Sequence, residues 1–279
     1  MKRKNSTAIR SSNGWHGGLV EWEVDNVVYI SVVFSWLLDQ AIKRKVELMA
    51  RSKNVLLGGP AAKFVGIADT GYPIAVAQHN PDACFTSYGC SNRCGFCIVS
   101  QTEGDLVELP KWEPKRIVCD NNLTACSRGH FDKVVDSLKS LTDIDINQGI
   151  SAMAITDYQA SRLAELDMSC VRLAWDNINY ESKFMRGWDI LRRAGFPRAK
   201  ISVYILIGYE DTPEDALYRL EVVRRLGGVP FPMRYQPLGC EKRNSYVGDN
   251  WTHKELVRFC RYWANLRITN RIPFAEFVG

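Results

Sequence analysis

The feature that most constrains the fold is a regular alternation of strand-like and helix-like segments over residues 116–238. Short apolar runs rich in β-branched residues alternate with longer amphipathic runs, and the connections are short. Its strand-like runs span 116–122, 144–149, 169–176, 200–208 and 231–238, and its helix-like runs span 130–141, 157–166, 182–195 and 212–228. A sixth strand-like run, at 83–89, precedes them. Such repetition implies right-handed crossovers and a parallel sheet, so we predict an α/β fold containing a partial parallel (β/α)6 barrel.

The segments on either side of this repeat complete the expected organisation. We expect three parts: a small α/β N-terminal unit at 1–81, the barrel at 82–245 and a C-terminal helical extension at 246–279. The first part contains an apolar strand at 27–34, a helix at 37–52 and a strand at 54–60 that closes in glycines, which indicates a trimmed Rossmann-like unit. It lacks the D-x-H-x-x-G motif of cobalamin-binding domains, so cobalamin is not expected.

Composition narrows the class of protein rather than its activity. Among 279 residues, 36 are Lys or Arg and 31 are Asp or Glu, and this net charge of +5 is compatible with a polyanionic partner without requiring one. The start lacks the apolar run of a secretory signal, and no uncharged stretch approaches the length needed to span a bilayer. Nine cysteines without an export signal indicate metal-binding or buried thiols, so we expect a cytoplasmic protein without a membrane partner.

Three of these cysteines cluster in the segment SYGCSNRCGFCIVSQ, residues 87–101. Cys90, Cys94 and Cys97 follow the first predicted barrel strand, at the face where such barrels build active sites. Their thiolates can converge on one soft metal centre, either zinc or an iron–sulfur cluster. A structural zinc site has four protein ligands, usually in two separated pairs, so three cysteines on one loop match such a site poorly. A [4Fe-4S] cluster takes one thiolate per iron, so three cysteines leave one iron open for another ligand.

The pattern C-x3-C-x2-C, with the aromatic Phe96 before the last cysteine, resembles the signature of the radical S-adenosylmethionine (SAM) superfamily. The resemblance implies a barrel of radical SAM type whose open iron is chelated by the amino and carboxylate groups of SAM. It further implies that one-electron reduction gives a 5'-deoxyadenosyl radical, which abstracts hydrogen from substrate. The reductant would be a protein such as flavodoxin or ferredoxin. The alternative is a structural zinc knuckle, or unrelated buried cysteines.

The same resemblance implies cofactor-binding positions after the second and fourth barrel strands. The stretch CDNN, residues 119–122, stands where the family has a polar or glycine-rich segment that meets the amino group of SAM. Asp120 and Asn121 are the candidates, although the usual Gly-Gly-Glu is absent. Asp176 matches a polar position that contacts the ribose. The plainer alternatives are that Asp120 is a turn residue and that Asp176 is a helix cap.

After the fifth strand, the segment VYILIGYEDT resembles the family's G-x-I-x-G-x-x-E region. The match places Ile205 and Gly208 near the adenine of SAM. This sequence departs from the pattern, because the first glycine is missing and the acidic residue, Glu210, arrives early. The alternative is that Gly208 simply ends a strand.

The alternation of side chains along the strands predicts interior residues independently of the family resemblance. Arg172 and Asp176 share one face of the fourth strand, and Arg234 and Gln236 share one face of the sixth. In a helix-wrapped barrel the apolar face packs on the helices, so these polar faces should line the interior. The two arginines and Gln236 are therefore candidates for binding the carboxylate or phosphate of a substrate. The alternative is that they pair with interior acids such as Asp145.

The reaction is less constrained than the cofactor. No general acid, base or nucleophile is assigned, because the cofactor carries the difficult chemistry. The chain resembles small radical SAM proteins of phages and bacteria, some of which rearrange amino-acid-modified thymine in DNA. We therefore predict isomerisation of such a base in DNA, in the host cytoplasm if a phage encodes the chain. The alternatives are modification of a small molecule or peptide, and a non-catalytic iron–sulfur or zinc-binding protein.

Overall fold

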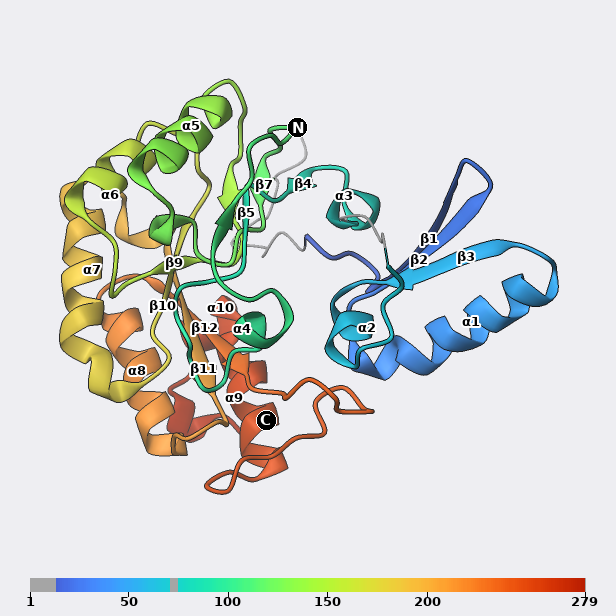
Figure 1. Cartoon of the computed structure of the whole chain (residues 1–279). Coiled ribbons are helices and arrows are strands. Elements are labelled where there is room, and N and C mark those ends of the chain that lie inside the picture. The colour runs from blue at the N-terminus through green and yellow to red at the C-terminus, as the bar shows by residue number, and fades with distance from the viewer. Residues whose placement is uncertain (1–13, 71–74, 279) are drawn as a thin grey trace, which may run out of the picture. The chain divides into compact units, whose positions relative to one another are not determined.

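The chain forms two compact units. The computed structural model describes residues 14–70 and 75–278 (Figure 1). The N-terminal unit comprises 14–121 and 236–246, and the C-terminal unit comprises 122–235 and 247–278. The chain thus passes from the first unit to the second between residues 121 and 122 and returns to the first at 236–246. The three-part division expected from the sequence stays a prediction.

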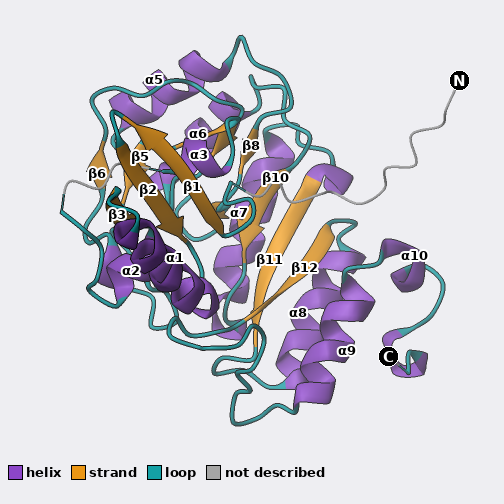
Figure 2. Ribbon diagram, turned by 90° about the vertical axis from the view of Figure 1, so that its right-hand side faces the viewer, coloured by secondary structure: helices purple, strands orange, loops and turns teal. Residues whose placement is uncertain are grey.

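A three-stranded sheet forms the first part of the N-terminal unit. It contains β1 (Leu19–Val24), β2 (Val27–Val32) and β3 (Asn54–Gly58), with α1 (Leu38–Ala50) joining the last two. β2 and β3 run parallel, as expected for a β-α-β unit, and α1 packs on the face that carries Ile30 and Leu57 (Figure 2). Strand β1 was not predicted; it pairs antiparallel with β2 across a tight turn at Asp25 and Asn26, both with positive φ.

Shorter elements of this unit lead into and out of the cysteine cluster. They are η1 (Ser35–Leu37), α2 (Pro60–Phe64), α3 (Val76–His79), β4 (Ala83–Cys84), β5 (Ser87–Tyr88), α4 (Val99–Thr102), β6 (Val107–Glu108) and β7 (Ile117–Val118). β4 pairs parallel with β7, and β5 pairs antiparallel with β6. The strand expected at 83–89 is therefore two short strands that have different partners.

A four-stranded parallel sheet forms the centre of the C-terminal unit. Its strands are β9 (Ile150–Ser151), β10 (Val171–Ala174), β11 (Ile201–Ile207) and β12 (Val229–Arg234). They lie in the order β12-β11-β10-β9, so that neighbours in the sheet are consecutive in the chain. Successive β-α-β units of one hand produce this order.

Helices join these strands and cover the sheet. They are α5 (Arg128–Leu138), α6 (Asp157–Leu163), α7 (Glu181–Arg193), α8 (Pro213–Arg225), α9 (His253–Trp263) and α10 (Leu266–Thr269), with the short strand β8 (Asp145–Ile146) and the 3-10 helices η2 (Leu123–Ala125), η3 (Ile178–Tyr180), η4 (Arg198–Lys200) and η5 (Phe274–Glu276). Figure 1 shows α6, α7 and α8 side by side, and contacts place α7 on β10 and α8 on β11 and β12. The predicted alternation of strands and helices is confirmed in this unit.

The local sequence explains where these elements begin and why they are buried. Thr212 caps α8 by accepting a hydrogen bond from the backbone N–H of Asp215, and Pro213 takes the first helical position, as predicted. β11 is apolar and almost wholly buried along its length, as a parallel strand covered on both faces should be. The result is a mixed α/β fold with parallel strands, and the six-stranded partial barrel stays a prediction. Within the described ranges, no helix has the length and apolar character to cross a membrane.

The C-terminal helix directs its aromatic residues inward. Phe259, Tyr262 and Trp263 of α9 are buried. Arg258 donates hydrogen bonds to the backbone carbonyl oxygens of Phe274 and Phe277, and its guanidinium lies 4.3 Å from the centre of the Phe274 ring. The aromatic and the basic residues of α9 therefore lie on the two faces of an amphipathic helix.

Candidate functional site

The three predicted metal ligands lie on one loop of the N-terminal unit, residues 89–106, here called the cysteine loop. The antiparallel pairing of β5 with β6 closes its base, with Ser87 opposite Glu108 and Tyr88 opposite Val107. Cys90, at the start of the loop, donates its backbone N–H to the carbonyl oxygen of Gly104 at 3.3 Å. The two ends of the cysteine loop are thus fastened together.

Gly89 makes this closure possible. Its φ is +66°, in the left-handed region that glycine adopts without strain. A Cβ at this position would overlap the backbone oxygen of Asp105 and would lie 2.7 Å from that of Gly104. The two strands of the loop approach each other so closely here that only glycine fits.

All three cysteines of the loop are half-buried thiols. None of the nine cysteines, each of which the structure describes, is in a disulfide. The backbone N–H of Cys97 donates to the carbonyl oxygen of Cys94 at 3.0 Å, and the backbone N–H of Asn92 lies 3.4 Å from the Sγ of Cys90. The loop is therefore folded back on itself around the thiols, and a backbone donor already points at one sulfur.

A carboxylate that the sequence analysis did not single out holds the cysteine loop to the end of β7. The Oε2 of Glu103 accepts hydrogen bonds from the backbone N–H of Gly89 at 3.0 Å and from the side-chain amide of Asn121 at 2.7 Å. The structure thus brings the predicted cofactor-binding residue Asn121 together with the cysteine loop. Glu103 belongs to no sequence motif, and its role in closing the loop follows only from the folded structure.

Asp120 anchors the strand that precedes the loop. Its carboxylate is fully buried and accepts hydrogen bonds from the backbone N–H of Thr86 at 2.6 Å, the hydroxyl of Thr86, and the hydroxyl of Ser87 at 2.7 Å. Burial raises the pKa of this carboxyl above its usual range, although the hydrogen bonds act in the opposite direction. The structure gives Asp120 an anchoring role, and its contact with a cofactor stays a prediction.

The hydroxyl of Tyr88 is an exception among these satisfied groups. The ring of Tyr88 packs on that of Phe85, with centroids 5.1 Å apart, and the hydroxyl oxygen is buried. No described residue forms a hydrogen bond with this oxygen. Burial, together with the negative charges of Glu103 and Asp120, raises the pKa of Tyr88 well above its usual range, so the hydroxyl stays protonated.

The C-terminal unit holds the residues predicted to contact ribose and adenine. Asp176 follows β10, and burial raises the pKa of its carboxyl from 3.8 to about 6 against the attraction of Arg219. Ile205 is buried within β11. Gly208 ends that strand with φ +82°, and its N–H donates to the Oδ1 of Asp211 at 2.8 Å. The cofactor contacts of these three positions stay predictions.

A buried ion pair beside these residues was missed. Arg219 of α8 is fully buried, donates to Asp211 at 2.5 Å and donates to the carbonyl oxygen of Trp175 at 3.0 Å. The indole N–H of Trp251 donates to the same carboxylate at 3.0 Å. The helical periodicity of the sequence could have indicated this ion pair. Arg219 shares the apolar face of α8 with buried Ala216, and a charged side chain on that face needs a buried partner.

The predicted substrate-binding residues lie in different settings. The guanidinium of Arg172 binds both carboxylate oxygens of Asp145 at 2.9 and 2.8 Å, and both side chains are buried, so this arginine is a member of a structural ion pair. Arg234 lies on β12 with a guanidinium nitrogen 3.4 Å from the Nδ1 of His253. Gln236 belongs to the N-terminal unit, where its amide donates to the carbonyl oxygen of Lys242 at 3.1 Å.

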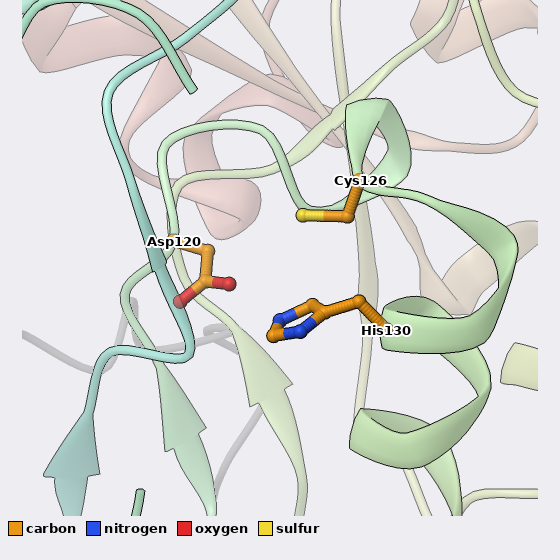
Figure 3. Close-up of side chains that lie close together, drawn as sticks. All are labelled: Asp120, Cys126 and His130. Carbon is orange, nitrogen blue, oxygen red and sulfur yellow. The ribbon is translucent and has the colours of Figure 1, made fainter. Parts of the chain in front are cut away.

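Two further potential ligands occur at the start of α5. The Sγ of Cys126 and a ring nitrogen of His130 lie within 4.8 Å of each other, and both side chains are buried. Figure 3 shows Cys126 on the turn before α5 and His130 in the first turn of that helix, and it also draws Asp120. Ser127 caps this helix by accepting a hydrogen bond from the backbone N–H of His130. The sequence analysis assigned no role to these residues.

Comparisons with known proteins include a distant structural neighbour. No protein-family model matches the chain, and no curated protein matches it. Among solved structures, the radical SAM methyltransferase TsrM from Kitasatospora setae, which has cobalamin and a [4Fe-4S] cluster bound, aligns with 14% identity and a TM-score of 0.41. The alignment covers 55% of this chain and 36% of TsrM. Functional inference therefore rests on the residues of this chain.

Proposed function

We propose that this protein is a radical SAM enzyme in which Cys90, Cys94 and Cys97 hold a [4Fe-4S] cluster. One observation carries the proposal: the three thiols of the C-x3-C-x2-C pattern are half-buried on a single loop whose ends are fastened by a strand pair and by Glu103. A cluster needs thiolates on a loop that folds around it, and this loop provides them.

Three cysteines on one loop favour a cluster over a single zinc ion, because structural zinc usually has four protein ligands in two separated pairs. A tetrahedral zinc ion about 2.3 Å from each sulfur would draw the sulfurs to within about 4 Å of one another. Among the residues that the structure describes, this triplet is not one of the groups whose ligand atoms lie within 4.8 Å of one another. A [4Fe-4S] cluster presents a separate iron to each thiolate, so it does not require that proximity.

The polar groups around the loop also fit a second ligand. Tyr88 offers a buried hydroxyl that no described residue uses, and Asn121 is held beside the loop by Glu103. When bound, a [4Fe-4S] cluster with SAM supplies a 5'-deoxyadenosyl radical after one-electron reduction. The chain's own residues have three tasks: the cysteines hold iron, Gly89 and Glu103 keep the loop closed, and Asp120 fixes the strand before it.

Anaerobic reconstitution with iron and sulfide, reduction with dithionite and chromatography for 5'-deoxyadenosine test the proposal. We expect about four iron atoms per chain and deoxyadenosine from SAM. Cys94→Ala should lose the deoxyadenosine, whereas Cys240→Ala, which changes a half-buried cysteine outside the cysteine loop, should keep it. A full, reducible cluster that yields no deoxyadenosine would reject the enzyme and favour a non-catalytic iron–sulfur protein. Zinc retained in place of iron would favour the zinc-binding alternative.

For the substrate, we propose an amino-acid-modified thymine in DNA. The enzyme would isomerise this base after a flavodoxin or ferredoxin has supplied the electron that reduces the cluster. The net charge of +5 and the exposed Lys254 and Arg261 on α9 support a polyanionic partner. Arg172 and Arg258 do not, because both are engaged within the protein. Deoxyadenosine formation should rise with duplex DNA that carries the modified base and not with unmodified DNA. A rise with a free small molecule or a peptide instead would support those substrates.

A further inference from the structure

Tyr88 lies at the base of the cysteine loop, two residues before Cys90. Its strand β5 is paired with β6, and its ring packs beside Phe85 against the core of the N-terminal unit. The side chain is therefore held in place by its backbone and its ring. The hydroxyl contributes nothing to this packing, and a phenylalanine would fill the same space.

A buried hydroxyl without a partner costs stability, because it has left water without gaining a hydrogen bond. Two carboxylates hold the backbone at the base of the cysteine loop, those of Glu103 and Asp120, and both have other hydrogen-bond partners. Asp120 accepts from Thr86 and Ser87, and the Oε2 of Glu103 accepts from Gly89 and Asn121. Neither carboxylate takes the Tyr88 hydroxyl. Unsatisfied groups of this kind are expected where a protein reserves a donor for a ligand.

We infer that the Tyr88 hydroxyl is a ligand-binding group, which donates its hydrogen bond to an acceptor atom of the SAM held at the cysteine loop. This inference rests on the proposed function and adds a residue that the cysteine motif does not contain. The acceptor is an oxygen or nitrogen of SAM, since a phenol hydroxyl has one proton to donate. Occupancy of the site satisfies a group that is otherwise buried without a partner.

The test compares Tyr88→Phe with Tyr158→Phe. Tyr158 is the matched control, because its hydroxyl is already satisfied by the carboxylate of Asp132 at 2.6 Å, in the other unit. In the absence of SAM, we expect Tyr88→Phe to unfold at the same or a higher temperature than the wild type, and Tyr158→Phe to unfold at a lower one. With the reconstituted cluster, equilibrium dialysis of SAM should show binding about 3- to 10-fold weaker for Tyr88→Phe. Tyr158→Phe should bind as the wild type does.

Three results would overturn the inference, and they are distinguishable. Unchanged SAM affinity in Tyr88→Phe, with deoxyadenosine formation that still depends on Cys94, would remove Tyr88 from the site and leave the proposed function standing. Loss of stability in Tyr88→Phe without SAM, as large as in Tyr158→Phe, would mean that the hydroxyl has a protein partner. A wild-type protein with a full cluster that fails to bind SAM would reject the proposed function and the inference together.

Discussion

Replacing Asp176 with asparagine should stabilise the protein at neutral pH. The carboxyl lies just after β10, where burial raises its pKa from 3.8 to about 6. Because the pKa is higher in the folded state than in the unfolded chain, the folded state binds more protons between these values. The contribution of Asp176 to stability is therefore fully present below about pH 4 and is lost as the pH rises through about 6. At pH 7.5 the ionised carboxylate favours unfolding.

The expected gain follows from the size of the pKa change. A rise from 3.8 to about 6 corresponds to about 3 kcal/mol, at about 1.4 kcal/mol for each pKa unit. The attraction of Arg219 already opposes the effect of burial within this net rise. Asp176 keeps part of its exposure to water, which attenuates the penalty, so we expect a gain of about 1–3 kcal/mol in the free energy of unfolding.

Urea unfolding followed by tryptophan fluorescence at about pH 4, 6 and 7.5 measures this gain. Asp176→Asn should exceed the wild type at pH 7.5 and match it at pH 4, where both side chains are neutral. Asp189→Asn, which changes an exposed acid on α7, should stay within about 0.5 kcal/mol at every pH. A gain of equal size at pH 4, or a loss at pH 7.5, would refute the electrostatic reasoning.

Three further perturbations test other parts of the structure. Gly89→Ala should lower the iron retained per chain after reconstitution, because its Cβ overlaps backbone as well as straining φ, whereas Gly104→Ala, with positive φ and open space, should retain more. Asp145→Ala leaves the charge of Arg172 buried and should cost about 3–5 kcal/mol in urea unfolding, part of which Arg172→Met should restore in the double variant. Burial lowers the pKa of His79 below 6.5. The contribution of His79 to stability is therefore present above pH 6.5 and is lost as the pH falls through the folded-state pKa. Between about pH 7.5 and pH 5, His79→Gln should lose less stability in urea unfolding than the wild type does.

The features predicted best from the sequence are those determined by neighbouring residues, such as helix starts and buried strands. The helices of the C-terminal unit begin near the expected positions because caps such as Thr212 are local signals. Strand β11 was predicted from a run that is apolar apart from Ser202. The missed strand β1 also had a local signal. Asp25 and Asn26 separate two alternating runs, which is typical of a hairpin with both turn residues at positive φ.

Contacts between distant residues were beyond the reach of the sequence. Strand alternation identified Arg172 and Asp145 as interior residues, and it left open whether the arginine binds substrate or pairs with the acid. Only the structure shows both carboxylate oxygens engaged. The closure of the cysteine loop by Glu103 has no local signature either, because its partners Gly89 and Asn121 come from 14 and 18 residues away.

The hydrogen bonds around the cysteine loop distinguish residues that stabilise the fold from residues whose polar groups can bind a ligand. The motif pointed to Asp120, yet its buried carboxylate is occupied by donors from Thr86 and Ser87. Tyr88 belongs to no motif, yet its buried hydroxyl has no partner among the described residues. Asp120→Asn places an amide N–H against existing donors and should destabilise the protein without SAM, as measured by thermal unfolding, whereas Tyr88→Phe should not. Opposite signs at two buried polar groups of one site would show that the anchor and the ligand-binding group are different residues.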